Sequence, residues 1–115
     1  MQSSFPPQDH CGPDSDPPAG AITDIPGILV GHAADESGKT GCTVIYFEED
    51  AVGGIDIRGT AAGTRQVEAL RSFHLVEKIQ AILLTGGSAF GMDASGGVMR
   101  YLEEQGRGFD VQVTR

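Results

Sequence analysis

Residues 81–91 read AILLTGGSAFG, an unbroken apolar run that leads into a glycine-rich corner. The run from Ala81 to Leu84 is typical of a strand covered on both faces, which places it at the centre of a sheet. A helix is predicted from the corner to Gln105, where Gly106 and Gly108 end it. Helical spacing predicts that this helix packs on the sheet through Phe90, Ala94, Val98, Tyr101 and Leu102. Strand, corner and helix together indicate an α/β fold.

Two strands are predicted at the start of the folded region. Pro26-Gly27 is a turn signal, and the apolar residues 28–30 form a short strand that Gly31 closes. The polar residues 35–41 are typical of a hairpin connection. Residues 43–47 are rich in β-branched and aromatic side chains and predict the second strand.

The segment between the second strand and the glycine-rich corner is less regular. Residues 48–50 are all acidic and predict a solvated turn, and residues 51–58 predict a third strand with a bulge at Gly53-Gly54. On that strand Asp56 and Arg58 share a face, either as an ion pair or, as we favour, as a solvated face. A loop at 59–63 precedes one or two short helical pieces within 64–78, with buried positions expected at Val67, Leu70, Leu75 and Val76. His74 is expected to be a packed or surface residue. Alternation at 109–114 predicts a further strand.

Composition divides the chain into a leader and one domain. Five of the six prolines lie within the first 20 residues, where apolar side chains are too few for burial to offset the entropy of ordering. We therefore predict a disordered leader at 1–20 and a single folded domain at 21–115, because 115 residues with 17 glycines leave room for one core at most.

Charge and cysteine content exclude several classes of function. A net charge of -8 has the wrong sign for a nucleic-acid-binding surface. Cys11 and Cys42 lie outside any CxxC or Cys/His cluster, which predicts reduced thiols and no metal site. No apolar run approaches the ~20 residues of a membrane span, and the leader lacks the features of a secretory signal. We therefore expect no membrane association and a cytoplasmic location.

The glycine-rich corner is the one motif suited to chemistry. Glycines let a ligand approach main-chain N–H groups, and a helix start adds donors, so Gly86, Gly87 and Ser88 are candidates to hold an oxyanion or a carboxylate. Alternatively, Ser88 merely caps the helix. The spacing fits neither a nucleophile elbow, nor a dinucleotide fingerprint, nor a Walker loop. His32 follows the first strand and is expected to be structural, because no Ser/His/Asp set accompanies it.

Several motifs in order resemble one enzyme family. AITDIPGILVGH (21–32) is similar to the opening of the DmpA-type L-aminopeptidase/D-amidase/esterase family, which includes β-peptidyl aminopeptidases and nylon-oligomer hydrolases. The resemblance continues through GCTVI and GIDIRG, then LVEK, and runs on through LTGGSAFG and GVMRYLEE to about residue 110. It implies a layered α/β/β/α sandwich of the N-terminal-nucleophile type, of which this chain is a truncated, partial version.

The resemblance also implies a mechanism. Such an enzyme cleaves its own precursor, and the new N-terminal serine or threonine of the second subunit attacks an amide or ester without any cofactor. In the family that nucleophile lies well downstream, so residues 21–115 correspond to the N-terminal part of the first subunit, and no catalytic residue is assigned in this chain. Expected partners are a small peptide, amide or ester substrate, the missing C-terminal part and, when complete, further copies of the enzyme. The alternative is a small stand-alone domain that binds an anionic metabolite at Gly86 to Gly91.

Overall fold

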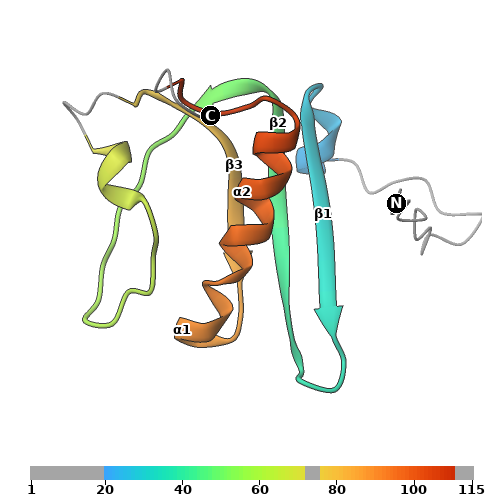
Figure 1. Cartoon of the computed structure of the whole chain (residues 1–115), viewed down its shortest axis with the longest axis vertical. Helices are drawn as coiled ribbons and strands as arrows, with labels where there is room; N and C mark the ends of the chain where they lie inside the picture. The colour runs from blue at the N-terminus through green and yellow to red at the C-terminus, as the bar shows by residue number, and fades with distance from the viewer. Residues whose placement is uncertain (1–19, 72–75, 111–115) are drawn as a thin grey trace, which may run out of the picture.

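A three-stranded antiparallel sheet organises the computed structural model, which describes residues 20–71 and 76–110 (Figure 1). Its strands are β1 (Ile28–Asp35), β2 (Thr40–Val52) and β3 (Lys78–Thr85), in the order β1-β2-β3. Two helices, α1 (Ser88–Gly91) and α2 (Ala94–Glu104), follow β3, and α2 runs along one face of the sheet. The predicted α/β class is confirmed.

The first two strands form a hairpin that is longer than the sequence predicted. The turn at Pro26-Gly27 is confirmed, with Gly27 at φ 85°. Gly31 does not close the strand, because it pairs with Val44 and the ladder continues to Asp35 opposite Thr40. At the hairpin tip the Asp35 carboxylate accepts hydrogen bonds from the Ser37 hydroxyl and the backbone N–H of Gly38 and Ser37, which lower its pKa.

The acidic segment 48–50 lies inside β2, so the predicted turn is wrong, as is the third strand at 51–58. Ala51 and Val52 end β2, and residues 53–58 form no strand. The irregularity predicted at Gly53-Gly54 occurs earlier, since the β2–β3 register shifts between Tyr46 and Ala51. Asp56 and Arg58 form an ion pair of 2.7 Å with largely exposed side chains. Strand propensity alone could not place the irregularity between Tyr46 and Ala51, because the contacts to this part of β2 come from Arg107, far along the chain.

Residues 81–84 do form a strand, but not the central one. Within the described sheet β2 is central, because it pairs with both β1 and β3, and β3 is at the edge. The connection from β2 to β3 carries a loop and one 3-10 helix, η2 (Val67–Leu70); another, η1 (Ile22–Asp24), precedes β1. Val67, Leu70 and Val76 are half-buried. His74, Leu75 and most of the strand predicted at 109–114 lie outside the described residues; Phe109 and Asp110 form no strand.

The predicted helix is divided in two. A break at Met92 and Asp93 separates the single turn of α1 from α2, and Phe90 is 93% exposed instead of packed. Three of the other predicted contact positions are half-buried: Ala94, Val98 and Leu102. Tyr101 is 51% exposed, yet its ring meets Tyr46 edge-on at 6.0 Å between centroids.

The end of α2 is confirmed and positions an arginine. Gly106 at φ 65° donates to the Glu103 carbonyl, and Arg107 N–H donates to the Leu102 carbonyl, the pair of bonds that defines a Schellman motif. This motif turns Arg107 back onto β2. Its guanidinium donates to the carbonyls of Phe47 and Glu48, forms an ion pair of 2.7 Å with Asp50, and lies 5.6 Å from the Tyr46 ring centroid. One side chain therefore joins the helix end to the irregular part of β2.

The two faces of the sheet are covered unequally. Tyr46 contacts α2, so the face that carries Tyr46 is the covered one. Residues opposite one another in the register share a face, which places six large apolar side chains on the other: Ile28, Val30, Ile45, Phe47, Ile82 and Leu84. We call this set the open face. None of the apolar side chains in the described part of the chain is fully buried, as expected when one of two apolar faces has no cover.

The contacts of Arg107 generate a stability prediction. Replacing Arg107 with Met removes the donors for two carbonyls and for Asp50, so we expect a lower urea midpoint, followed by circular dichroism. Arg100, exposed on α2, supplies the matched control, and Arg100→Met is expected to leave the midpoint unchanged. Equal midpoints for the two variants would contradict the structural role of Arg107.

Acid should weaken the same contact. The hydrogen bond from Arg107 lowers the pKa of Asp50 below its usual 3.8. A carboxyl with a depressed folded-state pKa contributes stability that is complete above the unfolded value and is lost as pH falls through the folded one. We therefore expect the wild type to lose its advantage over Asp50→Asn below about pH 3.8. The check is the urea midpoint of both proteins at a series of pH values between 7 and 2.

Candidate functional site

The glycine-rich corner is held against the hairpin by backbone and hydroxyl contacts. Gly86 N–H donates to the Gly41 carbonyl at 2.9 Å, and Gly91 N–H donates to the Gly87 carbonyl at 3.0 Å. The Thr85 hydroxyl is within 3.2 Å of the Gly91 carbonyl and 3.1 Å of the Gly86 carbonyl. The corner is thus fixed to the beginning of β2.

Close backbone approach explains the glycine at position 91. A Cβ built there would collide with the carbonyl of Gly86, which is backbone and cannot move aside. Gly87 has φ 81°, a conformation that side chains disfavour, and Ser88 also has a positive φ of 56°. The corner is therefore a tight, conformationally demanding turn.

Ser88 does not act as a helix cap. The N-cap of α1 is Gly87, and no side chain makes a capping hydrogen bond there. The helix behind the corner is only four residues long, so its dipole is too short to attract an anion strongly. The alternative of a simple capping serine is wrong, and the helix start adds little to an anion site.

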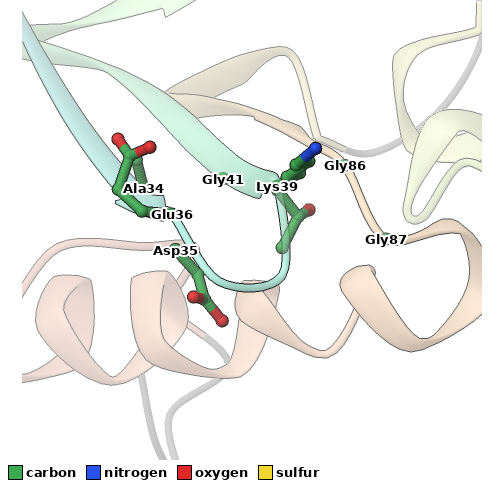
Figure 2. A pocket seen from close by; sticks show the side chains of 8 residues that line it. Ala34, Asp35, Glu36, Lys39, Gly41, Gly86 and Gly87 are labelled. Atoms are coloured by element: carbon green, nitrogen blue, oxygen red, sulfur yellow. The ribbon is translucent and has the colours of Figure 1, made fainter.

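A shallow hollow of about 490 Å³, which we call the first hollow, lies between the corner and the hairpin tip (Figure 2). Gly86 and Gly87 line it, whereas the exposed Ser88 is not among its lining residues; their role in a substrate pocket stays a prediction. The other side comes from the end of β1, the turn and the start of β2: Ala34, Asp35, Glu36, Lys39, Thr40 and Gly41. Sequence reasoning missed this wall, because only the strand pairing brings the hairpin tip to the corner.

The first hollow carries both signs of charge. Asp35 and Glu36 supply carboxylates and Lys39 an ammonium group (Figure 2). Because its hydrogen bonds lower the pKa of Asp35, that carboxyl stays ionised well below neutral pH. The hollow could therefore accept a ligand with a cationic end, an anionic end, or both.

A second hollow of about 440 Å³ adjoins the first, and the two share Ala34, Gly41 and Gly86. His32 and Thr43 also line it, opposite one another on β1 and β2, with His32 Nδ1 2.8 Å from Thr43 Oγ1. The sequence did not single out Thr43. The signal that reveals it is the strand register, since these two polar side chains face each other at the end of an apolar sheet face.

In residues 20–71 and 76–110, no group of three or more His, Cys, Asp or Glu side chains could hold a metal ion. None of the helices in these ranges is long and apolar enough to span a bilayer. Cys42 is half-buried with a free thiol; Cys11 lies outside the described residues.

Comparison with known proteins identifies the family. The family model of Peptidase family S58 matches residues 20–114, which is most of the chain. The chain belongs to Peptidase family S58. This is the DmpA-type and nylon-hydrolase family that the sequence motifs resemble, so the predicted membership is confirmed.

Individual proteins with sequences similar to this chain support the same family assignment. An uncharacterized aminopeptidase of Mycobacterium leprae is 41% identical over 99 residues, covering 79% of this chain and 27% of its own length. An uncharacterized aminopeptidase of Mycobacterium tuberculosis is 42% identical, covering 76% and 28%. A 6-aminohexanoate-oligomer endohydrolase of a Kocuria species is 38% identical, covering 71% and 21%. The chain thus spans between 21% and 28% of the length of these relatives.

Two glycines of this S58 chain give a matched test of the corner. Gly91→Ala forces a methyl group against the Gly86 carbonyl, and we expect a loss of roughly 3 kcal/mol in the free energy of unfolding. Gly96 lies within α2 with open space at its Cβ position, so Gly96→Ala should stabilise by roughly 0.5–1 kcal/mol. Denaturant titration of both variants is the measurement, and a tolerated Gly91→Ala would contradict the tight corner.

Proposed function

We propose that this chain is the N-terminal part of a self-processing serine-type hydrolase that cleaves N-terminal amino-acid amides, esters or short peptides through an acyl-enzyme. The observation that carries the proposal is a family match over residues 20–114, together with relatives of which the chain covers only 21–28%. A segment of this kind holds part of a fold and part of a site. By itself the chain is expected to be inactive.

The open face supports the proposed architecture. A sheet whose two faces are both apolar gains most stability when both are covered. Here α2 covers the part of one face near β3 and Tyr46, leaving Leu29 of β1 51% exposed, while on the other face Ile82 is 38% and Leu84 58% exposed. A second sheet on that face would complete the α/β/β/α sandwich implied by the family, and the polypeptide beyond this segment would supply it.

The proposed chemistry divides between the two parts. The serine or threonine hydroxyl at the new N-terminus of the second subunit adds to the substrate carbonyl, its α-amino group takes the proton, and the amine or alcohol leaves. Water then releases the acid from the acyl-enzyme. In this proposal Gly86, Gly87 and Ser88 lie beside the pocket as backbone, with Gly86 and Gly87 on its wall.

The substrate class follows from the relatives' names and the charges of the first hollow. The relatives are named as aminopeptidases and as 6-aminohexanoate-oligomer endohydrolases, and both names describe amide cleavage. Asp35 and Glu36 line the same hollow as Gly86 and suit a substrate that carries an amino group, while Lys39 could hold its anionic end. A stand-alone anion-binding domain is the weaker hypothesis, because α1 has four residues and two carboxylates accompany Lys39 in the first hollow. Oligomerisation and a cytoplasmic location stay predictions.

Hydrolysis of aminoacyl p-nitroanilides tests the proposal. The full-length protein should release p-nitroaniline and should run as two fragments on a denaturing gel, whereas the 115-residue chain alone should do neither. The DNA downstream of codon 115 should encode a second subunit that begins with Ser or Thr. Clear turnover by the purified 115-residue chain would sink the proposal.

The open face gives a separate test of the architecture. Leu84→Asp places a charge where the second sheet is proposed to pack, so the full-length protein should lose self-cleavage and solubility. In contrast, the isolated chain carrying Leu84→Asp should bind less of a hydrophobic dye than wild type. Val52, which is 83% exposed beyond the bulge, provides the control Val52→Asp, expected to change neither result. Normal processing of the Leu84→Asp protein would argue against a covering layer.

A further inference from the structure

His32 and Thr43 are the polar residues at one end of the otherwise apolar open face. Their registers place them on that face, beside Leu84. They line the second hollow next to the glycine-rich corner. A hydrogen bond of 2.8 Å joins His32 Nδ1 to Thr43 Oγ1. The pair therefore lies where the open face, the corner and the hairpin meet.

The two ring nitrogens of His32 have different surroundings. Either tautomer satisfies Nδ1, because the Thr43 hydroxyl can donate to it or accept from it. Among the described contacts, Thr43 is the partner of the ring through Nδ1, and none involves Nε2. Covering the open face would take water from the imidazole, and a buried polar atom needs a hydrogen-bond partner. Within the second hollow that partner can be a ligand.

We propose that His32 binds the amide or ester group that is cleaved in the substrate, through its Nε2 atom. Thr43 is then a positioning residue that fixes the imidazole ring. The inference rests on the proposed function, and it deepens it by adding a substrate contact on the open-face side of the corner. An imidazole nitrogen can donate to a carbonyl oxygen or accept from an amide N–H. The recognised group is thus the substrate's own amide or ester, common to all members of the class.

A competing role makes Thr43 the nucleophile and His32 its base. The 2.8 Å separation would allow proton transfer. However, no described carboxylate contacts the ring to orient it, and Thr43 lies within β2, with its backbone in the ladder to both neighbours. Nucleophile–base pairs are normally oriented by a third group. The positioning role is the one the contacts support, and the variants below separate the two.

Isosteric substitutions distinguish the two ring nitrogens. In the full-length enzyme, with alanine p-nitroanilide as substrate, His32→Ala should raise KM about tenfold, the loss expected for one hydrogen bond. The Gln amide nitrogen can occupy the place of Nε2, so His32→Gln should stay within about threefold of wild type. The shorter Asn reaches only the place of Nδ1, so His32→Asn should behave like His32→Ala. Thr43→Val should raise KM severalfold with kcat retained, and Thr43→Ser should restore it.

Thermal unfolding and active-site titration of each variant separate binding from folding. If His32→Asn is the better replacement and losses follow melting temperature alone, the pair is structural and the inference is overturned. Thr43→Val without residual turnover would identify Thr43 as a nucleophile, which also overturns it. An active wild type with equal KM for every variant overturns the inference alone. An inactive wild type overturns the proposed function and this inference together.

Discussion

A sheet with apolar side chains on both faces imposes the main constraint on this molecule. In the described residues α2 covers the face that carries Tyr46, while the face of Ile45 and Leu84 has no cover. The covered side is fixed by directional contacts as well as by apolar ones, since Arg107 reaches from the end of α2 to the carbonyls of β2. In residues 20–71 and 76–110, no comparable side-chain contact from a helix reaches the open face. If the proposed second sheet packs there, the stability of this face depends on that sheet, and the fold of this chain is tied to the rest of the enzyme.

The sequence predicted correctly those features that depend on residues close together in the chain. The Pro26-Gly27 turn, the strand at 81–84 and the helix end at Gly106 follow from torsional preferences and apolar runs, and all three occur. Sheet order and strand length depend on partners distant in sequence. Residues 48–50 are exposed as predicted, but they lie in β2 and form no turn. Arg107, about sixty residues away, contacts the Glu48 carbonyl and the Asp50 carboxylate there.

The tight turn at the corner could be predicted from its glycines, and it occurs. The assignment of Gly86 and Gly87 to a substrate pocket stays a prediction, and both line the first hollow. Side chains contributed by the hairpin could not be assigned, since Asp35 and Thr43 reach the corner only through the β1–β2 and β2–β3 registers. His32 illustrates the same limit: as an isolated letter it was expected to be structural, and only its cross-strand partner gives it a specific geometry.

The positions of the corner, the hairpin tip and the His32–Thr43 pair suggest why this chain would hold substrate-binding groups while the second subunit of the proposed enzyme holds the nucleophile. The corner, the hairpin tip and the His32–Thr43 pair all lie at the same end of the sheet, where β3 ends and β2 begins. A ligand held there would meet backbone, carboxylates and an imidazole from this chain on one side. The open face reaches the same end of the sheet. A layer that covers Ile82 and Leu84 would therefore bring its own residues to that end, opposite the groups of this chain. Burying apolar area and completing the pocket would then be one event, and an enzyme built in this way would gain activity only on assembly.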